Sequence, residues 1–267
     1  MSTETFREAW KLRYGFEPSF EFPDLAPFLR HRSVRRYSDR PVSEELMSAL
    51  MAAAQSAATS STLQLWSVVS VQEPERRETM VKLCAGYEHV RQAKWFLCFI
   101  ADHYRLKQAA AKVGECAEGL PYAEFFTMAV VDAALAAERL VCAAESIGLG
   151  ICYIGALRDH AAEVKDVLGL PEGTFGVFGL CIGWPEEPLG AGIKPRLSQG
   201  AVWHRERYDL DVDVSEYDER MRAFYETQEM KGEVTWSMRS GRRVDDHHMT
   251  GREILLGWLK SQGFLQS

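Results

Sequence analysis

The chain has 267 residues, of which 46% are hydrophobic and 26% charged, as in an ordinary globular protein. This composition excludes a disordered chain, a collagenous repeat and a small disulfide scaffold, and the length suffices for a core and a cofactor site in one or two domains. The formal net charge of −7 argues against broad binding to nucleic acid or an anionic membrane, so we expect neither as a partner.

The first half of the chain alternates predicted helices with short strands. Ser43 is typical of a helix N-cap, and the two carboxylates after it suit the positive end of the helix dipole. The predicted elements are a helix over Thr3–Tyr14, a linker or arm over Phe16–Pro27, a helix from Ser43 to about Ala57, a loop over Ala58–Gln64, a strand over Ser67–Val71, a helix over Pro74–Cys84 and a strand over Trp95–Ala101.

The second half is dominated by an apolar segment, Phe125–Ile147. Its length would suit a membrane span, but Asp132, Glu138 and Arg139 interrupt it, which favours a core helix at a dimer interface. After it we expect a strand at Ile151–Ile154, a helix at Asp159–Leu168, a strand at Gly176–Gly183 and helices at Asp213–Gln228 and Thr250–Gln262. Strands separated by helices indicate an α+β or α/β class, in one domain.

The usual catalytic signatures are absent from the sequence. There is no GxGxxG before a helix, no Walker loop, no GxSxG and no HExxH. The run Asp245–His248 offers metal-ligand atoms, but consecutive residues rarely converge, so we expect a solvated loop and no metal site.

The six cysteines form no CxxC pair, which argues against zinc-ribbon and thioredoxin-type sites. Most of them lie in apolar runs, as buried free thiols do in a reducing compartment. Residues 1–15 lack the apolar core of a secretory signal. We therefore expect a cytoplasmic protein.

Two cationic segments suggest binding of an anion. In an extended chain His31, Ser33 and Arg35 share one face, and such donors suit a phosphate dianion. Pro195 favours extended geometry at Lys194, so Lys194 and Arg196 project to one side. The alternatives are an exposed basic turn and a surface charge pair.

Two further segments suggest contact with a polar, flat ligand. The loop from Thr59 to Gln64 is rich in hydroxyl groups, which hydrogen-bond polar ligands. Gly155 ends a short buried strand and permits close approach of a flat ring to the backbone. The alternatives are an ordinary polar loop and a simple strand-to-helix turn.

Taken together, in this order, these segments resemble the nitroreductase family of flavoproteins, most closely its oxygen-insensitive, NADPH-preferring branch. The resemblance runs from about His31 to Trp236, which is most of the chain. Its motifs are HRSVRRYSDRPVSEE, ATSSTLQ, GYEHVRQAKWFLCFIAD, AAESIGLGICYIGALR, FGLCIGWP and IKPRL.

The resemblance implies an α+β fold with a mainly antiparallel central sheet flanked by helices, in an intertwined homodimer with FMN at the interface. It implies an FMN-binding domain over residues 31–267. Residues 1–30 exceed the usual start of the family, and we expect them to form an N-terminal helical arm that serves dimerisation. Tyr87 stands where relatives often have Gln. The residues that the resemblance assigns to FMN binding are His31, Arg32, Ser33, Arg35, Thr59, Ser60, Gln64, Tyr87, Tyr153, Ile154, Gly155, Ala156, Lys194 and Arg196.

The implied activity is a ping-pong transfer of hydride from NADPH or NADH, through FMN, to nitroaromatics, quinones or similar small acceptors. No catalytic side chain is needed, because the flavin carries the chemistry. The alternatives are a reductase that supplies reduced flavin to a monooxygenase, and a flavin-binding module without turnover. The loop Gln228–Glu233 lacks the arginines of NADPH-preferring relatives, for which Lys231, Arg239, Arg242 and Arg243 are candidate substitutes.

Overall fold

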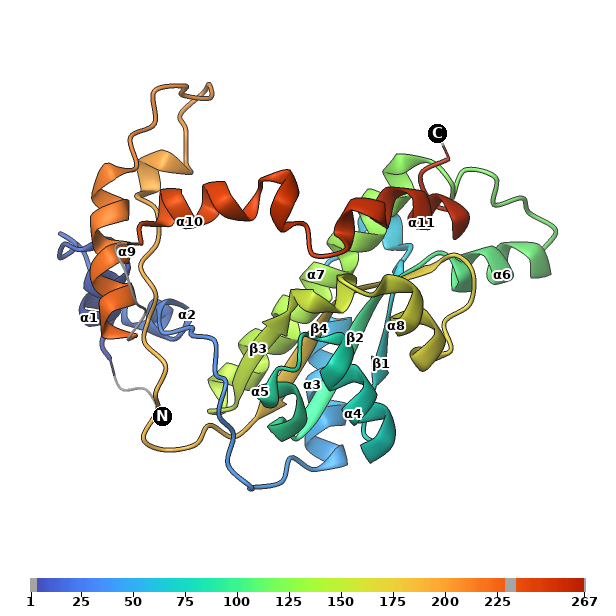
Figure 1. Cartoon of the computed structure of the whole chain (residues 1–267), viewed down its shortest axis with the longest axis horizontal. Helices are drawn as coiled ribbons and strands as arrows, with labels where there is room; N and C mark the ends of the chain where they lie inside the picture. Colours follow the sequence, from blue (N-terminus) through green and yellow to red (C-terminus); the bar gives the residue numbers. More distant parts are fainter. Residues whose placement is uncertain (1–3, 229–233, 267) are drawn as a thin grey trace. The chain divides into compact units, whose positions relative to one another are not determined.

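A computed structural model describes residues 4–228 and 234–266 and divides the chain into two compact units (Figure 1). The arm unit comprises Met1–Arg32 and Ala191–Met249, and the sheet unit comprises Ser33–Gly190 and Thr250–Ser267. The expected division into residues 1–30 and 31–267 stays a prediction.

The sheet unit is built on four antiparallel strands in the order β1-β2-β4-β3. The strands are β1 (Trp66–Ser70), β2 (Trp95–Asp102), β3 (Gly150–Ile154) and β4 (Thr174–Gly183). This confirms the expected α+β class with a mainly antiparallel sheet, and all four predicted strands are present within two residues at each end.

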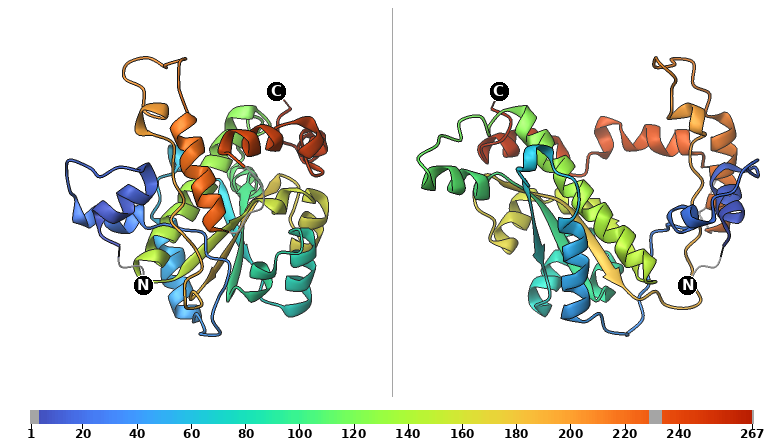
Figure 2. Two further views of the ribbon diagram at one scale, coloured as in Figure 1. Left: turned by 60° about the vertical axis from the view of Figure 1, so that its left-hand side comes forward. Right: turned by 180° about the vertical axis from the view of Figure 1, so that it is seen from behind.

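Helices cover both faces of the sheet (Figure 2). One face packs against α3 (Glu44–Gln55), α7 (Ala123–Ser146) and α11 (Leu255–Ser261), and the other against α4 (Pro74–Leu83), α5 (Glu88–Gln92) and α8 (Ala161–Leu168). Successive residues of β2 point to opposite faces, so Leu97 and Phe99 join the α7 side whereas Phe96 and Cys98 join the α4 side. Because both sides are covered, β2 is apolar from Trp95 to Ala101 rather than alternating.

Helix α7 has the position predicted from the apolar segment. Five of its alanines, among them Ala133, Ala136 and Ala137, are fully buried, and their small side chains allow close packing against α3 and the sheet. Ser43 caps α3 as expected, accepting a hydrogen bond from the backbone N–H of Leu46 at 3.2 Å. Within the described residues, no helix combines the length and the apolar character that a membrane span requires.

Two elements of the sheet unit differ from the prediction. Helix α6 (Tyr104–Lys112) was not predicted; it has no buried residue, and Leu106 alone of its side chains packs against the core cluster. The helix expected over Thr250–Gln262 is shorter: a 3₁₀ turn at Arg252–Ile254 precedes α11. Gly251, at φ 87°, occupies the left-handed conformation just before that turn, which a continuous helix cannot contain.

The arm unit contains α1 (Phe6–Tyr14), α2 (Ala26–Leu29), α9 (Ser215–Thr227) and α10 (Trp236–Arg243). Phe6, Trp10 and Ala26 form a small buried cluster, so the segment expected to be a linker ends in a packed helix. Tyr217, Met221 and Tyr225 of α9 form another cluster. Helix α10 was not predicted, and it too has no buried residue.

Candidate active site

The segment carrying Ser33 and Arg35 lies along the sheet because two glycines leave room for it. Ser33 forms a parallel bridge with Ile151, and the N–H of Val34 donates to the Ile151 carbonyl at 2.8 Å. Gly150 and Gly183 are paired across β3 and β4. A Cβ at Gly150 would lie 2.7 Å from Val34, and one at Gly183 would lie 2.8 Å from Tyr37.

The pairing of this segment with Ile151 determines which of its side chains face solvent. Val34 and Tyr37 are buried, whereas Arg35 is exposed. Among the described residues, Arg35 has no hydrogen-bond or ion-pair partner. The guanidinium is therefore exposed to solvent, and its binding of an anion stays a prediction.

The loop from Thr59 to Leu65 is organised by a carboxylate from α7. Asp132 is 1% exposed and accepts hydrogen bonds from the Thr59 hydroxyl at 2.5 Å, the Ser60 N–H at 3.1 Å and the Leu65 N–H at 3.0 Å. The Thr59 oxygen in turn accepts from the Gln64 N–H at 2.9 Å. One buried carboxylate thus holds both ends of the loop.

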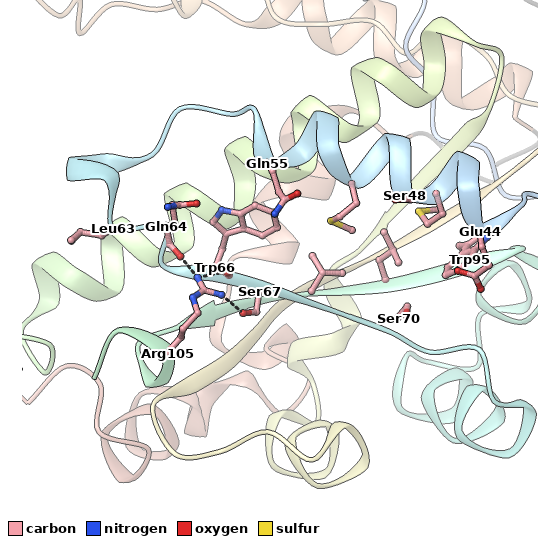
Figure 3. Close-up of a pocket in the computed structure, with 14 residues that line it drawn as sticks. Glu44, Ser48, Gln55, Leu63, Gln64, Trp66, Ser67, Ser70, Trp95 and Arg105 are labelled. Atoms are coloured by element: carbon pink, nitrogen blue, oxygen red, sulfur yellow. Dashed lines mark hydrogen bonds between the residues drawn. The ribbon is translucent and has the colours of Figure 1, made fainter. Parts of the chain in front are cut away.

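The backbone of this loop is strained. Ser61, Thr62 and Gln64 have φ values of 50°, 58° and 51°, a conformation that costs non-glycine residues about 1–3 kcal/mol each. Arg105 of α6 holds the far end of the loop: it donates to the Gln64 and Trp66 carbonyls and, at 2.9 Å, to the Ser67 hydroxyl (Figure 3). Such strain persists where surrounding contacts enforce it, which is common at functional sites.

These contacts separate the roles of Thr59 and Ser60. The Thr59 hydroxyl is committed to Asp132, whereas the Ser60 hydroxyl forms no hydrogen bond with any part of the chain that the structure describes. Of the two predicted contacts, Ser60 therefore has the hydroxyl available to a ligand.

A pocket of about 680 Å³ lies beside this loop, between α3 and the face of β1 and β2 (Figure 3). Gln64, Trp66 and Arg105 line one end, and Glu44 and Trp95 line the other. Gln64 is the single predicted FMN-binding residue in its lining, so this pocket is not the site that the sequence predicted.

At the end of β3, the side chains of Ile154 and Ala156 are buried, so these residues can contact a ligand only through the backbone. The Tyr153 hydroxyl donates to Glu138 of α7 at 3.2 Å, and its ring packs edge-on against Phe178 with centroids 5.3 Å apart. Burial, and then the Glu138 carboxylate, raise the pKa of Tyr153. The phenol therefore stays protonated at neutral pH.

The turn after β3 is fixed by a residue far along the chain. Arg252 donates to the Gly155 carbonyl at 3.1 Å and pairs with Asp159 at 2.5 Å. Thr250 also donates to Asp159, at 3.3 Å. The segment preceding α11 thus clamps the Gly155 turn.

In the arm unit, one buried guanidinium joins the two remaining cationic segments. Arg13 of α1 is 5% exposed and donates to the carbonyls of Leu29 at 3.1 Å, His31 at 2.6 Å and Lys194 at 2.8 Å. Its own carbonyl accepts from the Arg196 N–H at 2.9 Å. The structure thus brings the His31 and Lys194 segments together.

The side chains of these segments have different surroundings. Ile193 and Pro195 are buried while Lys194 and Arg196 are exposed, as the expected alternation requires. Arg32 is instead largely covered, and it pairs with Glu4 at 3.1 Å and donates to the Ala191 carbonyl at 3.3 Å. Both of these Arg32 contacts lie within the arm unit.

Tyr87 lies at the start of α5 and is 44% exposed. Its ring stacks on His89 with centroids 5.0 Å apart, which leaves its outer surface open to a ligand. Of the candidate substitutes for the missing arginines, Arg239 lies over the Tyr225 ring and Arg243 donates to the His248 carbonyl. Lys231 lies outside the described residues.

Sequence reasoning missed Asp132, Arg13 and Arg252 as organisers of these segments. Asp132 had been noted only as an interruption of an apolar helix, although a charge there is a signal because buried carboxylates need several donors. Arg13 and Arg252 carry no local signal, because their partners are distant in the sequence. Arg13 and Lys194 are 181 positions apart, and Arg252 and Gly155 are 97 positions apart.

Comparison with protein families gives two matches. The family model described as "Nitroreductase family" matches residues 29–184, and "Nitroreductase family, C-terminal domain" matches residues 194–267.

Named relatives match nearly their whole length. The chain is 38% identical over 247 residues to "FMN reductase (NADPH)" of Bacillus subtilis, covering 90% of this chain and 97% of that protein. It is 35% identical to "Oxygen-insensitive NADPH nitroreductase" of Salmonella typhimurium, covering 91% and 98%.

Solved structures agree with these matches. The NfrA1 nitroreductase of B. subtilis superposes with a TM-score of 0.84 at 35% identity, over 91% of this chain and 99% of that one. The NADPH:FMN oxidoreductase of Vibrio harveyi, complexed with NAD⁺, gives 0.79 at 31% identity, over 91% and 99%. By sequence and by fold, the chain belongs to the nitroreductase family, as its motifs had indicated.

Proposed function

We propose that the protein is an FMN-dependent NAD(P)H oxidoreductase of the nitroreductase type. The names of its relatives, which include an NADPH-linked FMN reductase and an NADPH nitroreductase, support the reaction. The observation that carries the proposal is that the predicted flavin segments are held by dedicated contacts that leave ligand-competent groups exposed.

The donor chemistry of these segments fits FMN. The FMN phosphate needs cationic donors, which the exposed Arg35 guanidinium offers. The polar edge of the isoalloxazine ring needs hydroxyl and amide groups, which Ser60 and Gln64 offer. The Gly155–Ala156 turn presents backbone with little side chain, which suits a flat ring.

When bound, the flavin supplies the carrier of hydride and electron pairs. The chain's own residues then bind and orient it. Lys194 offers an exposed cation for the N1/O2 edge of the flavin, where reduction places negative charge. No acidic or basic side chain is assigned a catalytic role, which is consistent with Tyr153 remaining protonated at neutral pH.

We also propose that the protein acts as a homodimer in the cytoplasm. The dimer is supported by family membership. The compartment is supported by six free cysteines, because such thiols are typical of a reducing environment.

The test is the visible spectrum of the purified protein, with FMN added where needed, before and after NADPH in the absence of oxygen. The proposal expects a flavin absorbance that is bleached by NADPH and restored by a nitroaromatic or a quinone. A flavin band that NADPH leaves unchanged would indicate a binding module without turnover. Failure to take up FMN at saturation would refute the proposal.

A second candidate is a flavin reductase that releases reduced flavin to a monooxygenase. It is favoured by the similarity to "NADPH-flavin oxidoreductase" of Vibrio harveyi, at 33% identity. Steady-state kcat/KM with free FMN against that with a nitroaromatic distinguishes the two. A much larger value for free FMN would make nitro reduction incidental.

A further inference from the structure

The N-terminal arm reaches two of the segments assigned to the flavin, although it lies outside the matched family regions. Those regions begin at residue 29, so α1 (Phe6–Tyr14) lies before the part of the chain that the family models match. Arg13 in the last turn of α1 nevertheless bonds to the carbonyls of His31 and Lys194. A helix outside the matched family regions thus contacts motif residues directly.

The buried guanidinium of Arg13 connects backbone segments through several hydrogen bonds. A guanidinium carries five N–H donors in fixed directions. Here each of its three nitrogens donates to a different backbone carbonyl, at 2.6 to 3.1 Å. The side chain is 5% exposed, so solvent competes little for those bonds. The backbone of Arg13 adds a fourth bond, from Arg196.

Helix α1 is itself held in place. Thr5 and Glu8 form a capping box at its start, and Gly15, at φ 83° with its N–H bonded to the Lys11 carbonyl, ends it. The buried rings of Phe6 and Trp10 anchor one face. A rigid helix can therefore transmit a fixed position to Arg13.

We propose that Arg13 is a positioning residue for FMN, so that the N-terminal arm is part of the cofactor-binding apparatus. It fixes the His31 and Lys194 segments relative to each other, so that the side chains of both segments can contact the same FMN molecule. The inference rests on the proposed function, because it takes His31 and Lys194 as flavin contacts. It assigns the arm a role in cofactor binding that is independent of dimerisation.

The experiment compares Arg13→Met with Arg7→Met in the full-length protein. Arg7 lies on the same helix, but its contacts, with Glu21 and the Pro18 carbonyl, stay within the arm. The measurements are the FMN dissociation constant of the apoprotein, the two-electron potential of bound FMN and the melting temperature.

The proposal expects Arg13→Met to raise the FMN dissociation constant by about tenfold or more, since it loses charge-assisted hydrogen bonds. It also expects the flavin potential to fall by about 30 mV, which is a tenfold change for a two-electron couple, because the Lys194 cation is displaced. Arg7→Met should leave the FMN dissociation constant within about twofold of that of wild type. The two-electron potential should change by no more than the amount that corresponds to about twofold in an equilibrium constant.

Hydrogen exchange of the wild-type protein provides a test that needs no variant. Addition of FMN to the apoprotein should slow amide exchange in residues 6–14 together with residues 29–32 and 193–196. Protection confined to the latter two stretches would overturn the proposal. An Arg13→Met protein with a lower melting temperature but unchanged affinity and potential would overturn it as well.

The proposed function is tested separately. Wild-type protein that binds FMN and is bleached by NADPH, alongside an Arg13→Met protein of unchanged affinity and potential, refutes the role of Arg13 alone. Wild-type protein that takes up no FMN refutes both.

Discussion

Replacement of Asp132 by Asn should destabilise the protein and loosen the flavin at once. The carboxylate accepts from the Thr59 hydroxyl and from the N–H groups of Ser60 and Leu65, and hydrogen bonds to a charged group contribute roughly 1.5–3 kcal/mol each. An asparagine keeps one acceptor oxygen but turns an NH₂ group toward donors. Losing one or two of the bonds therefore costs about 3 kcal/mol.

A loss of that size lowers the melting temperature by roughly 6–12 °C in a chain of this length. The loop also contains three residues in the left-handed conformation, and without Asp132 it should relax and bind FMN more weakly. Thermal unfolding of the apoprotein and FMN titration measure the two effects. Thr59→Val should weaken FMN binding in the same direction, and Thr59→Ser, which keeps the hydroxyl, should restore it.

The control for this prediction is Thr174→Val, which removes a buried hydroxyl bonded to the Pro171 carbonyl at 2.6 Å. It should cost about 1 kcal/mol of unfolding free energy and leave FMN affinity unchanged. The reasoning is refuted if Asp132→Asn melts within about 2 °C of wild type, less than about 1 kcal/mol predicts.

Three further substitutions or treatments test other parts of the site. Arg35→Ala should raise the FMN dissociation constant roughly 10- to 150-fold, from loss of about 1.5–3 kcal/mol, and should leave riboflavin binding unchanged; equal losses for both ligands would show that Arg35 does not contact the phosphate. Lys194→Ala should lower the two-electron potential of FMN and slow reduction by NADPH, and a potential equal to that of wild type would place Lys194 away from the ring. A thiol reagent at pH 8 should label the exposed Cys116 before Cys84, whose pKa burial raises to about 12, because the thiolate is the reactive form; early labelling of Cys84 would contradict its burial.

The sequence predicted the elements whose burial is complete. Strand β2 (Trp95–Asp102) is buried at every position, and a continuous apolar run between polar turns is the mark of such a strand. Helices α6 and α10 have no buried residue, so neither contains a continuous apolar run of the kind that marks β2. The sequence thus reports on the core of this protein much better than on its surface helices.

The features of the candidate site that could be predicted are those that depend on neighbouring residues in the sequence. The exposed pair Lys194 and Arg196 follows from the proline between them. The commitment of the Thr59 hydroxyl does not follow from the loop sequence, because its acceptor, Asp132, is 73 positions away. Such assignments depend on tertiary contacts that no spacing rule encodes.

The three long-range contacts share one physical logic. Asp132, Arg13 and Arg252 each bind backbone N–H or carbonyl groups of a segment that carries a motif, and they thereby fix its conformation. Asp132 also engages the Thr59 hydroxyl. A ligand that meets segments already fixed in this way pays less conformational entropy on binding. Two of these residues lie in α1 and the segment before α11, where the sequence shows no functional motif. Variation in those segments should therefore tune cofactor affinity while the motifs stay unchanged.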